Sequence, residues 1–181
     1  MTIDRDEAGA MLADIEAISA HVKQSAIYRA SSVTLLYWGA IVVAANIVSF
    51  LDGRWAGYSW AAFDLIGAVG GVAILARAPR SAGLGARILA AFVLLFVFGM
   101  IWSTLLGQFN PRQVAAFWPS LFMFVYALAG LWLGRAFTLI GVGLTALVLA
   151  GYFWAGEAFD LYLAAVNGGG LILCGLWMRR A

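Results

Sequence analysis

The sequence predicts an all-α, polytopic membrane protein with six transmembrane helices in three hairpins and an N-terminal cytoplasmic amphipathic helix. Of the 181 residues, 64% are hydrophobic and only 11% are charged, whereas a soluble domain averages about 25% charged residues. The mean hydropathy is +0.94. A soluble fold of this length could not bury so much apolar surface, so we expect lipid to cover part of it.

Residues 1–30 are predicted to form an amphipathic helix outside the bilayer. Asp4 and Glu7 have the spacing of a capping box, and apolar residues then recur at steps of three and four. Because the first half of the helix is acidic, docking on anionic lipid is disfavoured. We expect this stripe to bind a cytoplasmic protein, a second copy of the chain, or the basic loop 77–87. The candidate partner-binding stripe is Met11, Ile15, Ile18 and Val22.

Residues 31–181 are predicted to form the transmembrane domain, in six apolar stretches close to the ~20 residues that a bilayer requires. The second stretch is interrupted by Asp64, and the fourth has an earlier possible start at Pro111, with Asn110 as its cap. The predicted spans are residues 33–51, 58–76, 86–106, 114–133, 136–154 and 160–178.

The basic residues predict the orientation of these spans. With both termini in the cytoplasm, nine of the eleven Lys and Arg residues lie inside, and only Arg54 and Arg112 lie outside. The positive-inside rule requires this asymmetry. Removing the second span would place the later loops on the wrong sides, so the charge pattern supports that span despite Asp64.

Asp64 is the leading candidate for function, because an ionised carboxylate inside a span costs ~2.5–3.5 kcal/mol on insertion scales. Gly67 and Gly71 share its helical face and form a small-xxx-small pair, which predicts that Asp64 points into the bundle. Two interpretations are open. Asp64 either acts in binding or transport, or it is a structural group paired with Arg54 or Arg112.

Further polar residues lie at a similar predicted depth in the outer halves of the spans. Together with Asp64 they predict an outward-facing polar pocket. The alternative is that they form interhelical hydrogen bonds, which are worth about 0.6 kcal/mol each. These residues are Asn46, Asn167, Ser103, Thr104 and Ser120.

Glycines in three of the spans, and Gly134 between the fourth and fifth, are predicted to pack helices closely. The run Asn167 to Gly170 also permits a broken helix of the kind that binds substrates in transporters. Close packing against the glycine-rich second span is the alternative. The predicted helix-packing glycines are Gly67, Gly71, Gly130, Gly134, Gly168, Gly169 and Gly170.

The sequence contains no motif that indicates catalysis, a cofactor, a metal site or nucleic-acid binding. One cysteine, Cys174, and one histidine, His21, exclude an intramolecular disulfide and a two-histidine metal motif. Glu157 and Asp160 are interpreted as a loop residue and a helix cap. We therefore expect neither an enzyme nor a cofactor.

The layout of the spans and three phrases, RASS at 29–32, FWPSLFM at 117–123 and AGLWLGR at 129–135, resemble a group of small, uncharacterised bacterial six-helix inner-membrane proteins. The resemblance implies a bundle in a bacterial inner membrane and carries no functional residues. The predicted function is a non-enzymatic regulatory, sensing or scaffold component that engages a partner through its N-terminal helix. The alternative is a small oligomeric transporter or channel that uses Asp64 and the polar pocket.

Overall fold

The computed structural model describes residues 5–77 and 84–180, and of the side chains before residue 31 it describes those of Met11, Asp14, Ile15, Tyr28 and Arg29. Every element in these ranges is helical. Six helical segments there are long and apolar enough to cross a membrane, as the sequence predicts, and the protein is a multi-pass helical bundle. The segments are Ser31–Leu51, Gly53–Ile74, Leu89–Leu106, Pro111–Leu133, Arg135–Trp154 and Gly156–Met178.

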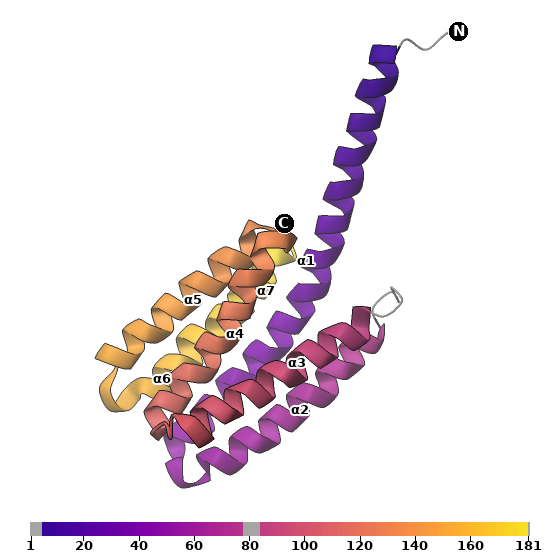
Figure 1. Ribbon diagram of the computed structural model, residues 1–181. Helices are drawn as coiled ribbons and strands as arrows, with labels where there is room; N and C mark the ends of the chain where they lie inside the picture. The colour runs from indigo at the N-terminus through magenta and orange to yellow at the C-terminus, as the bar shows by residue number, and fades with distance from the viewer. Residues whose placement is uncertain (1–4, 78–83, 181) are drawn as a thin grey trace.

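The first helix, α1 (Arg5–Leu51), is one uninterrupted helix of 47 residues. At 1.5 Å per residue it is about 70 Å long, and its N-terminal part extends well beyond the rest of the bundle (Figure 1). From the sequence, a cytoplasmic helix is predicted to end near residue 30 and the first span to begin as a separate helix. The structure has no break there, because residues 10–38 contain neither Gly nor Pro to end a helix.

Residues 78–83 connect the second and third spans. They belong to the predicted basic loop 77–87 and lie outside the described ranges. A short helix, η1 (Gly53–Trp55), leads into α2 (Ala56–Arg77). The third span is α3 (Leu84–Met100), which continues as the π-helical segment η2 (Ile101–Leu106).

The fourth and fifth spans are α4 (Pro111–Leu133) and α5 (Arg135–Trp154). The helix α4 begins at Pro111, the earlier possible start, and not at residue 114 of the predicted span. The Asn110 side chain accepts a hydrogen bond from the Gln113 amide, and the Gln113 side chain completes a capping box. Gly134 links the two helices at φ 126°, a conformation that side chains with a Cβ rarely adopt. Gly134 was predicted as a packing residue, and in the structure it makes the turn between α4 and α5.

The sixth span has four parts that follow one another without a break. It comprises the 3-10 helix η3 (Gly156–Ala158), α6 (Phe159–Leu163), the π-helical η4 (Ala164–Gly168) and α7 (Gly169–Met178). Gly168 ends a local widening of a continuous helix, and Gly169 and Gly170 follow it. Of the two interpretations of the run 167–170, the broken helix is not seen.

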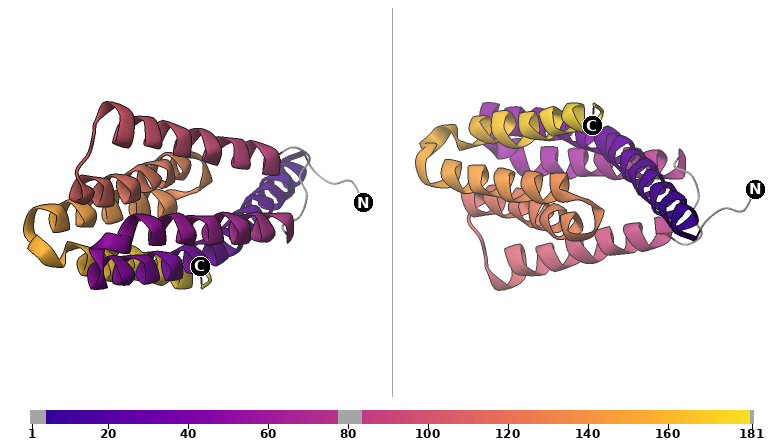
Figure 2. Two further views of the ribbon diagram at one scale, coloured as in Figure 1. Left: turned by 90° about the horizontal axis from the view of Figure 1, so that it is seen from below. Right: turned by 90° about the horizontal axis from the view of Figure 1, so that it is seen from above.

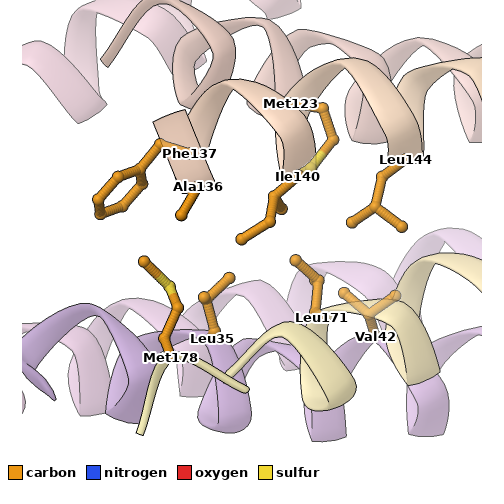
Figure 3. Close-up of a cluster of buried hydrophobic side chains, with 9 residues drawn as sticks. All are labelled: Leu35, Val42, Met123, Ala136, Phe137, Ile140, Leu144, Leu171 and Met178. Carbon is orange, nitrogen blue, oxygen red and sulfur yellow. The ribbon is translucent and has the colours of Figure 1, made fainter. Parts of the chain in front are cut away.

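The closest helix pairs differ from the three expected hairpins, which would join the first span to the second, the third to the fourth and the fifth to the sixth. The closest pairs are α4 with α5 and α1 with α7, and the grouping into hairpins separates the members of both pairs. The two pairs face each other across the main apolar core, with α4 and α5 on one side and α1 and α7 on the other (Figure 3). That core consists of Leu35, Val42, Met123, Ala136, Phe137, Ile140, Leu144, Leu171 and Met178. We call α1, α4, α5 and the α6–α7 span the packed unit.

The helix α3 is held to its neighbours by aromatic rings. The Phe92 ring lies between Trp38 of α1 and Phe122 of α4, with centroids 6.4 and 5.8 Å away, and Phe96 packs on Trp118 at 5.0 Å. Along the described residues α3 does not pack closely on α2, and the two helices run apart in both views of Figure 2.

Candidate functional site around Asp64

Glycines and aromatic rings form the contact between α2 and α1. A Cβ at Gly67 would overlap the Trp38 ring, and a Cβ at Gly70 would overlap the Tyr37 ring. The Tyr37 hydroxyl donates a hydrogen bond of 2.6 Å to the Ile66 carbonyl. Gly67, predicted to pack helices, therefore lies at the contact between α2 and α1, against the Trp38 ring.

Asp64 lies on the flank of α2, next to this contact. It is eight residues into α2, roughly 12 Å from the first residue of the helix. Its side chain is half-buried, and it makes no hydrogen bond or ion pair with any of the residues that the structure describes.

The two arginines that one of the two interpretations pairs with Asp64 are bound to other groups. The guanidinium of Arg54 pairs with Asp52 at 3.2 Å, on the turn before α2. Arg112 donates from Nε and Nη2 to the Tyr152 carbonyl at 3.2 and 2.7 Å, and from Nη1 to the Gly156 carbonyl. Its guanidinium carbon also lies 5.6 Å from the centre of the Tyr152 ring. Arg112 thereby connects the start of α4 to the end of α5. The pairing of Asp64 with Arg54 or Arg112 is not observed.

Small residues extend from Asp64 along the part of α2 that α1 does not cover, whereas on the other flank Trp60 packs against the main core and Gly67 meets Trp38. At 100° per residue, four small residues outside that covered flank lie within about 60° of Asp64 around the helix. Two of them, Gly57 and Gly71, have no atom within 4 Å of an added Cβ, and the two alanines are exposed. We call this surface the Asp64 face; it consists of Gly57, Ala61, Asp64, Ala68 and Gly71. The predicted packing role of Gly71 is not met by any residue described in this chain.

The other residues of the predicted polar pocket bond mostly within their own helices. Asn46 donates to the Val42 carbonyl at 2.8 Å. Thr104 donates to Met100 at 2.6 Å and Ser120 to Ala116 at 2.8 Å. None of these three residues forms a hydrogen bond with Asp64 in the described part of the chain.

Ser103 and Asn167 are almost fully buried, at 2% and 3% exposure. The Ser103 Oγ and the Asn167 Oδ1 have no hydrogen-bond partner among the described residues. Asn167 lies in η4, which packs on α1, whereas Ser103 lies in η2. The two are therefore on different spans, and neither is joined to Asp64.

The sequence analysis did not single out the buried polar residues Ser32 and Ser49 of α1. The signal that could have found them is a strict alternation of steps of three and four. It runs along one face of α1 at Ser32, Leu35, Gly39, Val42, Asn46 and Ser49, and this face packs on α7 and η4.

The glycines of the sixth span pack on α1 and α5, and the second span is not their partner. A Cβ at Gly168 would lie 2.8 Å from the Val43 amide nitrogen, and one at Gly170 would lie 2.6 Å from a methyl group of Leu144. Gly169 has nothing nearer than 3.9 Å. In α4, a Cβ at Gly130 would overlap Thr138 of α5.

Of the predicted N-terminal stripe, Met11 and Ile15 are exposed, at 52% and 63%. The side chains of Ile18 and Val22 lie outside the description. In the part of the chain that is described, no group of three or more His, Cys, Asp or Glu side chains is placed to hold a metal ion, and Cys174 is a half-buried free thiol.

Comparison of the chain with protein-family models, with curated proteins and with solved structures gives no match.

Proposed function

We propose that this protein is a non-enzymatic component of a bacterial inner membrane that regulates, senses or scaffolds by engaging a protein partner through the N-terminal part of α1. Both termini lie in the cytoplasm in this proposal. The nine-to-two distribution of basic residues supports that orientation.

The continuity of α1 is the observation that carries the proposal. One helix of 47 residues contains both the exposed Met11 and Ile15 and the span Ser31–Leu51, which packs against α7 and η4. Because residues 10–38 contain no Gly or Pro at which the helix could kink, a partner bound near residue 11 would move or hold the start of the span itself. A separate helix on a loop would not couple the two in this way.

The alternative function, a small oligomeric transporter or channel, requires several polar groups that converge on a path. Asn46, Thr104 and Ser120 each donate to a carbonyl of their own helix, which is typical of groups that satisfy themselves inside a bundle. The unpaired Asp64 supports the alternative. A proteoliposome flux assay on wild type and Asp64→Asn tests it, and flux that is lost with the substitution would favour transport.

The experiment for the proposed function compares two faces of the same helix. Met11→Ser with Ile15→Ser removes the apolar stripe, whereas Ala13→Ser with Ala20→Ser changes positions about 180° around the helix. In native membranes, we expect only the first variant to lose crosslinking of its N-terminal segment to the partner protein. We also expect only that variant to reproduce the phenotype of gene deletion. Equal crosslinking in both variants, or an unaltered phenotype after deletion of residues 5–28, would contradict the proposal.

The orientation has its own test. Reporter fusions at the C-terminus should show the activity of a cytoplasmic reporter, and a fusion in the turn at Gly53 should show that of an external one. The reverse pattern would place the N-terminal part of α1 outside the cytoplasm and remove the proposed partner.

A further inference from the structure

We propose that the Asp64 face of α2 is the docking surface for a transmembrane helix of another protein, and that this helix carries a basic side chain at mid-membrane depth. The surface is separate from the N-terminal part of α1, so the inference does not depend on the proposed function above.

The first step is that Asp64 has no hydrogen-bond or ion-pair partner among the residues that the structure describes. In the six apolar segments, the basic residues are Arg54, Arg112 and Arg135, each within two residues of a segment end. Arg54 is paired with Asp52, and Arg112 binds backbone carbonyls. A carboxylate at this depth in lipid is strongly disfavoured without a cation or a hydrogen-bond donor.

The second step is that the surface around Asp64 is open and shaped for a helix. The Cβ positions of Gly57 and Gly71 face empty space within 4 Å, and Ala61 and Ala68 are exposed. Small residues at such spacing allow a second backbone to approach closely. The opposite situation holds at Gly67, where Trp38 already fills the space.

The third step concerns which occupant fits. A second copy of this chain, docked symmetrically, would bring Asp64 against its own counterpart, because the same surface is used on both sides of a two-fold axis. Two carboxylates at close range repel each other. A helix with a single Lys or Arg instead places opposite charges in a medium of low dielectric constant, where their attraction is strong. Charge complementarity therefore favours a different protein with a basic transmembrane residue.

The test uses the full-length protein in phosphatidylcholine vesicles, with a donor dye on a C-terminal tag. The probes are acceptor-labelled transmembrane peptides of 23 residues, built of Leu and Ala, with Lys or Leu at the centre. We expect the Lys peptide to bind about tenfold more tightly than the Leu peptide, since polar contacts between membrane helices reach this size in peptide systems. Asp64→Ala should abolish the difference.

Two further variants separate the charge from the shape of the surface. A Cβ at Gly71 would meet nothing within 4 Å, so we expect Gly71→Leu to leave the bundle folded and the Lys peptide to bind several-fold more weakly. Asp160→Asn, which alters another half-buried carboxyl, is the matched control and should keep the preference. Deletion of residues 5–28 should also keep it, which distinguishes a failure of this inference from a failure of the proposed function.

Equal affinity for the Lys and Leu peptides would overturn the inference, as would a preference that survives Asp64→Ala. Self-association of the full-length protein that depends on Asp64 would assign the surface to a second copy and also overturn it. Cation flux through wild-type vesicles that disappears in Asp64→Ala would assign Asp64 to transport instead.

Discussion

The packed unit and the two outlying helices α2 and α3 differ in what meets across their interfaces. The packed unit contains glycines that face the backbone of a neighbouring helix: a Cβ at Gly39 would lie 2.9 Å from the Gly168 carbonyl oxygen, and one at Gly141 would overlap the backbone of Met123 and Ala127. Gly151, in the same unit, faces the Tyr162 ring. In α2 and α3 a glycine faces a ring: Gly67 meets Trp38, and Gly99 meets Trp118 at 2.8 Å.

Burial differs in the same direction. In the most apolar 18 residues of the span Ser31–Leu51, 39% are buried, and the same fraction holds for Arg135–Trp154. The corresponding values are 6% for Gly53–Ile74 and 11% for Leu89–Leu106. A backbone fixed by helical hydrogen bonds cannot yield to an added methyl group, whereas a ring can rotate or shift. The comparison therefore predicts that a Gly→Ala substitution lowers the free energy of unfolding by different amounts in the two regions.

The largest effect is expected for Gly141→Ala in α5. The new methyl group would meet backbone atoms of α4, so the two helices must separate, at a cost of about 2–3 kcal/mol. Gly143→Ala, two residues along the same helix with nothing within 4 Å, is the matched control and should be neutral or slightly stabilising. The free energy of unfolding in SDS titrations, followed by far-UV circular dichroism, measures both. Equal stabilities would show that α4 and α5 are not in close backbone contact.

The next effect is expected for Gly168→Ala in η4. Its methyl group would lie 2.8 Å from the Val43 nitrogen and 3.1 Å from the Gly39 oxygen, which predicts a loss of about 1–2 kcal/mol. The adjacent Gly169→Ala, whose nearest neighbour is 3.9 Å away, should not lose stability. The same SDS titration applies, and a loss in Gly169→Ala equal to that in Gly168→Ala would remove the assignment of this contact to α1.

Much of the fold could be predicted from local patterns, because the length, hydropathy and capping of a helix depend on residues that are close together in the sequence. The start of α4 at Asn110 and Pro111 is an example. The continuity of α1 was missed because the polar stretch at 29–32 marks the membrane boundary, and a helix crosses such a boundary freely when no residue breaks it.

The candidate site was less predictable because its geometry depends on contacts between distant residues. The sequence indicates that Asp64 lies in a span, but cannot show that Arg54 and Arg112 bind Asp52 and the end of α5. Likewise, glycines mark close packing without naming the partner. Gly168 packs on α1, which precedes it by more than 120 residues.

A smaller effect is expected for Gly67→Ala, since the Trp38 ring can move to accommodate the methyl group. We expect the free energy of unfolding to fall by about 1 kcal/mol. Tryptophan fluorescence should also shift, because the surroundings of Trp38 change. Gly71→Ala on the same helix meets nothing within 4 Å and is the control for helix propensity. A loss in Gly67→Ala as large as that in Gly141→Ala would contradict the distinction between ring and backbone neighbours.

The smallest effect is expected for Tyr37→Phe, which removes the hydroxyl that donates to the Ile66 carbonyl. A hydrogen bond between membrane helices contributes about 0.6 kcal/mol on average, and the Tyr37 ring keeps its contact with Gly70. Tyr58→Phe is the control, because Tyr58 is 75% exposed and its ring packs on Trp55. Unfolding in SDS should separate the two variants by that small amount. If Tyr37→Phe instead cost as much as Gly168→Ala, a single hydroxyl would hold α2 to α1 as firmly as backbone packing holds η4 to α1. The weaker attachment of α2 would then have to be abandoned, and with it the argument that α2 is free to receive a second helix.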